Sequence, residues 1–282
     1  MKLFDKIFGG IEMTWKRVLI LSAVCGVIPG ILMIPDWLKN TSFQNPGITF
    51  EFWILMALFI ILNCKKPWEA AVKTFVFFLI SQPLIYLVQV PFFINHWKIF
   101  DYYPRWFIIT LLTLPGAFIG WYVKKGNLLS VLLLSVLNAI LCMELPGTVN
   151  SMLRYFPKMT VAAVFILAEI VIFTFCLIRE KKLRILAFVI AGVLTVAGCF
   201  WLITTELGAE SSMAFPADGE APYTLESESD LFAVTFNGES VIVSYKPHDL
   251  RTPGEHTVIY RDASGEVHEA RITYGDMNCR IE

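Results

Sequence analysis

Residues 164–173, with the sequence VFILAEIVIF, decide what kind of fold this chain has. Nine of these ten residues are apolar, and they belong to an apolar run over residues 159–178 that is long enough to cross a membrane as a helix. The exception is Glu169, near the middle of the run. A charged carboxylate at that depth costs roughly 2.5–3.5 kcal/mol on insertion scales. We therefore expect Glu169 to face other helices or water, or to carry a proton, rather than to face lipid.

The rest of the chain repeats this apolar character. The 282 residues are 56% hydrophobic and 17% charged, which is more apolar surface than a soluble core can hide. The composition therefore predicts an α-helical polytopic membrane protein with seven transmembrane helices. The predicted spans are residues 17–35, 48–64, 69–93, 105–123, 127–146, 159–178 and 183–204.

The distribution of basic residues predicts the orientation of these spans. If the N-terminus is cytoplasmic, the inner segments carry 13 Lys and Arg residues and the short outer loops carry 5. This bias follows the positive-inside rule. It predicts a multi-pass plasma-membrane protein of bacterial type, with residues 1–16 as a cytoplasmic lead, residues 17–204 as the membrane domain and an extracytoplasmic C-terminus.

The C-terminal part of the chain has the opposite charge balance. Residues 205–282 carry 5 Lys and Arg against 15 Asp and Glu, whereas residues 1–204 carry 18 against 9. We expect a linker over residues 205–218, followed by a small all-β, sandwich-like extracytoplasmic domain over residues 219–282.

Alternating apolar residues predict the strands of this domain. Asn237-Gly238 indicates a tight hairpin, because both residues tolerate positive φ. Apolar residues alternate with polar ones on both sides of this turn and again further along the chain. The predicted strands are residues 223–225, 231–236, 240–245, 256–260 and 267–274.

The final hairpin, TPGEHTVIYRDASGEVHEARITY at residues 252–274, resembles the closing strands of bacterial immunoglobulin-like surface repeats. Those repeats show a Pro-Gly turn, an alternating strand and an Asp-x-x-Gly turn. The strand before the second turn is shorter here, and no clear first half precedes it. The resemblance implies a small adhesive or spacer module and concerns no membrane span. The residues that fit are Pro253, Gly254, Val258, Tyr260, Asp262 and Gly265.

Four of the predicted spans place a polar side chain at a similar depth. Counted from the basic inner boundary, these side chains lie roughly 15–21 Å inside a hydrocarbon core about 30 Å thick. A lone acid among amides and hydroxyls is one way to build a proton or cation site. The alternative is a polar cluster that holds helices together by hydrogen bonds. The four residues are Glu169, Asn138, Gln82 and Thr113.

The surroundings of the acids predict their charge. No basic residue lies at the depth of Glu169, so we expect this acid to be mostly neutral unless water reaches it. Glu51 and Glu144 lie at predicted outer ends, where we expect them to be solvated.

Glycine or proline residues lie inside three of the predicted spans. The GxxxG spacings from Gly26 to Gly30 and from Gly116 to Gly120 bring helix backbones close together. Two interpretations stay open: hinged helices that move, or static packing with tolerated kinks. The prolines concerned are Pro29, Pro83 and Pro115.

Motifs of enzyme chemistry are absent from the sequence. It contains no HExxH, GxSxG, CxxC or Walker A pattern, and no histidine within the predicted spans. We therefore expect no catalytic residue, cofactor or metal site, and we expect His248, His256 and His268 of the tail to be solvated. The acidity of the tail argues against a nucleic-acid partner.

Two functions are consistent with this pattern. The first is movement or sensing of a small solute or ion through the polar layer centred on Glu169. The second is a non-transporting scaffold or sensor in the bilayer, whose outer β domain binds an extracytoplasmic protein or the cell wall.

Overall fold

The structure, a computed structural model, describes residues 2–93, 96–154, 156–207, 210–250, 252–275 and 278–281. The chain forms two compact units, Met1–Cys199 and Phe200–Glu282. The first unit is helical, and the second is built mainly of strands.

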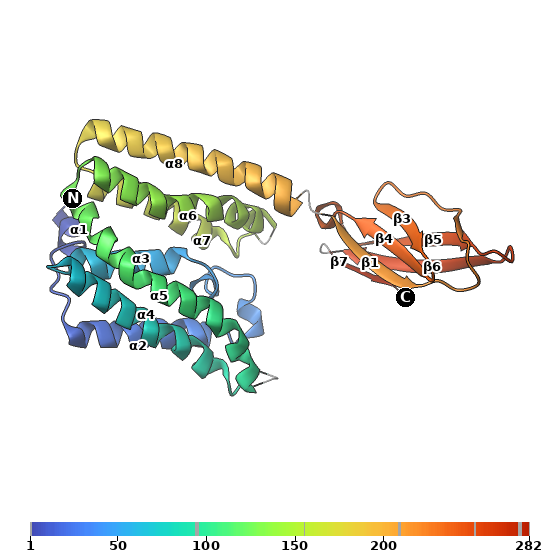
Figure 1. Ribbon diagram of the computed structural model, residues 1–282, viewed down its shortest axis with the longest axis horizontal. Helices are drawn as coiled ribbons and strands as arrows, with labels where there is room; N and C mark the ends of the chain where they lie inside the picture. Colours follow the sequence, from blue (N-terminus) through green and yellow to red (C-terminus); the bar gives the residue numbers. More distant parts are fainter. Residues whose placement is uncertain are drawn as a thin grey trace. The chain divides into compact units, whose positions relative to one another are not determined.

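Helices α2 to α8 of the first unit lie side by side, and consecutive helices run in alternating directions (Figure 1). The helices are α1 (Lys2–Ile7), α2 (Trp15–Leu32), α3 (Glu51–Asn63), α4 (Pro67–Gln89), α5 (Tyr103–Gly120), α6 (Leu128–Arg154), α7 (Thr160–Leu177) and α8 (Lys181–Trp201). Six segments of the described chain are helices long and apolar enough to cross a membrane. They are Trp15–Leu32, Pro67–Gln89, His96–Lys125, Leu128–Arg154, Thr160–Leu177 and Lys181–Thr204.

The prediction of a seventh full-length span, at residues 48–64, is wrong. Helix α3 has 13 residues, or about 20 Å at 1.5 Å per residue, which is short of a hydrocarbon core about 30 Å thick. The preceding residues Asn45–Gly47 form the 3₁₀ turn η2. The hydroxyl of Thr49 donates to the carbonyl of Asn45 at 2.8 Å and holds the chain in that turn. The apolar run therefore begins before its helix does.

One end of α3 lies against the chain that precedes α2 and against the 3₁₀ turn η4 (Trp121–Lys125). Asn63 Oδ1 accepts hydrogen bonds from the backbone amides of Gly9 and Ile11, at 3.0 and 2.9 Å. The carbonyl oxygen of Cys64 accepts from Trp121 Nε1 at 3.0 Å and from Lys124 Nζ at 2.7 Å. This side of the helical unit is called the Asn63 end below.

The body of α3 belongs to both cores of the helical unit. Ile54, Leu58 and Leu62 pack in a core with α6, α7 and α8. Trp53 and Ile60 pack in a second core with α2, α4 and α5. Because α3 contributes to both, it joins the two halves of the unit.

Replacing Asn63 with Ala should loosen the N-terminal segment. Asn63 Nδ2 also donates to the carbonyls of Ile7 and Phe59, at 2.7 and 2.8 Å, so the whole amide is used. The segment is partly exposed, so water replaces some of these bonds, and we expect a loss of about 1–3 kcal/mol. Hydrogen exchange should become faster in peptides from residues 2–14. Unchanged exchange in these peptides would contradict this role of Asn63.

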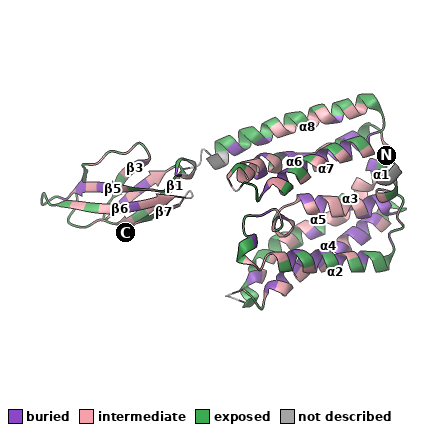
Figure 2. Cartoon of the chain, turned by 180° about the vertical axis from the view of Figure 1, so that it is seen from behind, coloured by how far each residue is buried: buried purple, intermediate pink, exposed green. Residues whose placement is uncertain are grey.

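The outward faces of the helices are apolar. Figure 2 shows exposed residues along the outer side of α2 and α8. On α2, Ile20 is 54% and Ile28 52% exposed, and on α8, Val193 is 64% and Val196 70% exposed. Large apolar side chains in such numbers on one surface are typical of multi-pass membrane proteins.

The second unit contains two antiparallel sheets. One has the strand order β1-β4-β3, and the other has the order β2-β5-β6-β7. The strands are β1 (Ser211–Pro216), β2 (Thr224–Leu225), β3 (Phe232–Asn237), β4 (Ser240–Tyr245), β5 (Gly254–Arg261), β6 (Val267–Gly275) and β7 (Asn278–Ile281). The hairpin predicted at Asn237-Gly238 joins β3 to β4, and Gly238 has a φ of 60°.

The structure differs from the prediction at both ends of this unit. Strand β1 lies within the predicted linker at residues 205–218 and pairs with β4 along its whole length. Strand β7, which has four residues, pairs with β6. Met213, Phe215 and Ala217 alternate here and pack against the core, but the residues between them, Ala214 and Pro216, are also apolar, so the sequence shows no contrast of apolar with polar positions.

The two sheets share one core. Phe232, Val241 and Val243 from the first sheet pack with Val258, Tyr260 and Ile272 from the second. Alternate residues of each strand therefore point between the sheets, as in a sandwich. The predicted all-β region is confirmed as two antiparallel sheets.

Candidate functional site

The structure divides the four predicted polar residues into two pairs. Gln82 on α4 and Thr113 on α5 belong to the half of the unit that contains α2. Thr113 donates its hydroxyl to the carbonyl of Thr110 in its own helix, at 2.7 Å. Asn138 on α6 and Glu169 on α7 belong to the other half. Among the described residues, no hydrogen bond connects the two pairs.

Glu169 is buried between helices without a hydrogen-bonding partner. The residue is 4% exposed, and neither carboxyl oxygen has a partner in the described part of the chain. Further along α7, the hydroxyl of Thr174 accepts from Asn138 Nδ2 at 3.4 Å. That contact joins α6 to α7 and leaves Asn138 Oδ1 buried and also without a donor among these residues.

Two further carboxyl groups lie near Glu169. Glu51, in the first turn of α3, is 2% exposed, and its Oε1 accepts from Asn45 Nδ2 at 3.1 Å. Glu144 on α6 accepts from the backbone amide of Phe50 at 3.2 Å. Glu51 and Glu144 are close enough to each other and to Glu169 for their carboxyl groups to interact electrostatically. The expectation of a solvated side chain is therefore wrong for Glu51, whereas Glu144 is half-buried. We call these three residues the carboxyl cluster.

The short helix α3 explains why this cluster is buried. Counted along their helices from the Asn63 end, Glu169, Glu51 and Glu144 lie about 12, 18 and 24 Å away at 1.5 Å per residue. Glu51 reaches this depth because α3 starts inside the unit, after the turn η2. The first turn of a helix favours a carboxylate. That local signal is present in the sequence, but nothing local shows that Asn45 and Phe50 form hydrogen bonds with Glu51 and Glu144.

The first GxxxG spacing lies where two helices approach closely. A Cβ atom on Gly26 would lie 2.7 Å from the carbonyl oxygen of Ser81 and from the Cβ of Leu84. A Cβ atom on Gly30 would lie 2.9 Å from the carbonyl oxygen of Ile85. Both contacts are with α4, so α2 and α4 need glycine at these two positions.

The second GxxxG spacing does not make such a contact. Nothing lies within 4 Å of a Cβ atom placed on Gly116, and the nearest atom to one on Gly120 is Ile61 Cδ1 at 3.6 Å. The expectation of close backbone approach at this spacing is therefore wrong for Gly116. The three prolines lie inside α2, α4 and α5, and they are Pro29, Pro83 and Pro115.

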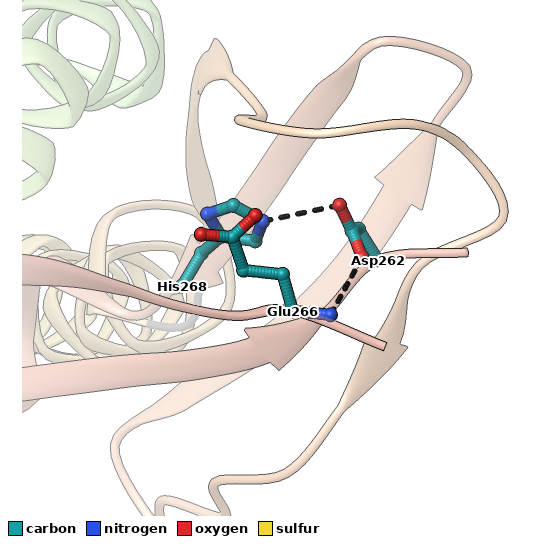
Figure 3. Close-up of side chains that lie close together, drawn as sticks. All are labelled: Asp262, Glu266 and His268. Carbon is teal, nitrogen blue, oxygen red and sulfur yellow. Dashed lines mark hydrogen bonds and ion pairs between the residues drawn. The ribbon is translucent and has the colours of Figure 1, made fainter. Parts of the chain in front are cut away.

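A different group of polar side chains lies at the β5–β6 turn of the second unit (Figure 3). His268 Nε2 lies 3.3 Å from Asp262 Oδ2, and both side chains are largely buried. Asp262 Oδ1 accepts from Ser264 Oγ at 2.6 Å and from the backbone amide of Glu266 at 2.9 Å. The hydrogen bond from Ser264, with those from Glu266 and His268, holds the pKa of Asp262 well below its usual range. Asp262 therefore stays ionised.

The expectation that the tail histidines are solvated does not hold for two of them. His268 pairs with Asp262, as described above. His256 is partly buried and stacks on Phe232, with 5.2 Å between ring centroids. The side chain of His248 lies outside the described residues.

No family model, curated protein or solved structure matches this chain.

Proposed function

We propose that this chain is a multi-pass plasma-membrane protein that moves or senses a small solute or ion, with the carboxyl cluster as its proton-binding site. The observation that carries the proposal is Glu169. Its carboxyl group is 4% exposed, neither oxygen has a partner among the described residues, and two other carboxyl groups lie nearby. An acid in such a place is rare in a membrane segment unless it serves a function.

The length and surface of the helices support placement in a membrane. Six helices are long and apolar enough to cross one, and large apolar side chains cover their outward faces. The Asn63 end carries Lys65, Lys124, Lys125 and Lys181, which favours a cytoplasmic location for that end. In this arrangement α8 starts on the cytoplasmic side, and the β unit follows it on the extracytoplasmic side.

The chemistry of the cluster supports proton binding. Three carboxylates in apolar surroundings repel one another, and each loses hydration, so they cannot all be charged without a bound cation. Gain or loss of one proton changes the charge shared by α3, α6 and α7. A change in the packing of these three helices is how such a site would be coupled to solute movement.

Infrared difference spectroscopy on the purified protein tests this proposal. We expect bands of protonated carboxyl groups whose intensity changes with pH, because a proton-binding site must gain and lose its proton. One band should disappear in Glu169→Gln and persist in Glu180→Gln, because Glu180 is exposed. A Glu169 band that never titrates would mean a sealed structural acid and would refute the proposal.

The second candidate function is a scaffold or sensor that acts through the β unit. It is favoured by the fact that this unit has a core of its own, formed between two sheets. The resemblance of residues 252–274 to immunoglobulin-like surface repeats suggests a protein or cell-wall partner. Deletion of residues 209–282 distinguishes the two functions: a transporter should keep its flux, whereas a scaffold should lose its activity and tolerate Glu169→Gln.

A further inference from the structure

Three potential metal ligands converge at the β5–β6 turn. One ligand atom from each of Asp262, Glu266 and His268 lies within 4.8 Å of the other two. Figure 3 shows the Glu266 side chain folded back so that its carboxyl group overlaps the His268 ring in this view, while Asp262 lies beyond one ring nitrogen. The three side chains come from the end of β5, the turn and the start of β6. A single hairpin therefore fixes their spacing.

Two of the three side chains are held in place by neighbours. The hydrogen bonds from Ser264 and from the backbone amide of Glu266 fix the carboxylate of Asp262. The ring of His268 stacks on that of Tyr260, with centroids 5.4 Å apart and planes inclined by 26°. Metal sites use such supporting contacts to orient their ligands. Glu266 is exposed and can adjust its position.

The separation of the two held atoms suits one ion. Nitrogen and oxygen ligands of zinc lie 2.0–2.2 Å from the metal, so two ligands of a tetrahedral ion are roughly 3.3–3.5 Å apart. His268 Nε2 and Asp262 Oδ2 are 3.3 Å apart. The ion would lie between these two atoms.

The charges around the turn also favour a cation. Asp262, Asp218 and Glu239 all act electrostatically on Tyr223, so several acids lie in this region. The guanidinium of the neighbouring Arg261 is bonded to other acceptors, because its Nε donates to Glu226 Oε1 at 2.7 Å and its Nη1 to the carbonyl of Gly265 in the same turn at 2.7 Å. A bound divalent cation would offset the charge of Asp262 and Glu266.

We propose that Asp262, Glu266 and His268 bind a divalent transition-metal ion such as zinc. An imidazole nitrogen with two carboxylate oxygens suits zinc and its neighbours in the first transition row, whereas calcium and magnesium prefer oxygen ligands throughout. Binding releases the proton from His268 Nε2 to solvent, or moves it to Nδ1 through solvent. The fourth position of a tetrahedral ion is left for water. This proposal is independent of the carboxyl cluster.

The test uses the full-length protein in detergent, without a polyhistidine tag and stripped with a chelator. Titration calorimetry with zinc chloride should show a site that is weakened by about tenfold or more in Glu266→Gln and in His268→Asn, because loss of a ligand exceeds the 10–100-fold effect of outer contacts. Glu269→Gln is the matched control. Glu269 is exposed on the opposite face of β6, so the Glu269→Gln variant should bind zinc as the unmodified protein does. Magnesium chloride should give no binding at this site.

X-ray absorption of the zinc-loaded protein gives a second readout. We expect a shell of nitrogen and oxygen only, at about 2.0–2.2 Å. A sulfur shell would place the zinc on cysteine and would overturn the proposal. Zinc binding that is absent, or equal in Glu266→Gln, His268→Asn and Glu269→Gln, would also overturn it and leave Asp262 and His268 as an ion pair that stabilises the turn.

Discussion

Replacement of Glu169 with Gln should lower proton movement through the reconstituted protein by about 100-fold or more, the usual effect of removing a positioned proton-transfer group. Gln has nearly the same shape as protonated Glu and keeps the buried site neutral, so the fold should survive. The amide of Gln cannot release or accept a proton near neutral pH. The effect on flux should therefore be large and the effect on stability small.

Vesicles that contain the protein and a trapped pH-sensitive dye measure this flux under an imposed potassium diffusion potential. Glu51→Gln should also reduce the flux, because it removes one member of the carboxyl cluster. Glu180→Gln should leave it unchanged, since Glu180 is exposed between α7 and α8. Equal flux in the unmodified protein and in Glu169→Gln would exclude Glu169 from any proton path.

Replacement of Tyr260 with Ala should unfold much of the β unit. Tyr260 is 2% exposed and packs against the rings of Tyr223, Phe236 and His268. Loss of a buried aromatic side chain costs about 3–5 kcal/mol. The unit spans residues 200–282, and domains of this size have a free energy of unfolding of about 4–12 kcal/mol in total. Its melting temperature should fall by about 12 °C or more.

Hydrogen exchange of peptides from β3 to β6 in the full-length protein measures this loss. Tyr260→Phe is the matched control, because it removes the hydroxyl that accepts from the backbone amide of Asp218 at 2.8 Å and keeps the ring. It should cost about 1 kcal/mol. Peptides from the helical unit should exchange at unchanged rates in both variants. A small effect of Tyr260→Ala would mean that the two sheets do not depend on this ring.

The long helices were predictable because each carries its own evidence. An apolar run such as that around Glu169 is visible in the sequence without knowledge of its neighbours. The same reliance on apolar runs predicted a helix for the residues just before α3, where the structure has a turn. Ile48 and Phe50 are as apolar as a span requires, but the turn at Asn45–Gly47 delays the helix until Glu51. The hydropathy of these residues does not show that the helix begins only at Glu51.

The candidate site was only partly predictable, because depth counted along one helix says nothing about which helices meet. Glu169 was identified from its apolar surroundings. Glu51 and Glu144 looked like boundary residues, but hydrogen bonds from Asn45 and from the backbone of Phe50 hold them against the segment that precedes α3. In the same way, Asp262 and His268 are six residues apart in sequence, and they meet because β5 and β6 pair in a register that the turn sets.

The shortness of α3 has an electrical consequence for a protein in a membrane. Moving one elementary charge across the whole membrane takes about 2.3 kcal/mol per 100 mV. Glu51 lies about 18 Å from the Asn63 end, so if that end marks one face of a hydrocarbon core of about 30 Å, Glu51 would be roughly 60% of the way through it. Moving a proton from the Asn63 end to Glu51 would therefore take about 1.4 kcal/mol per 100 mV of membrane potential. The rest of the potential would fall between Glu51 and the opposite face of the membrane. Membrane voltage would thus set how often the cluster is protonated, and the start of α3 sets how strongly.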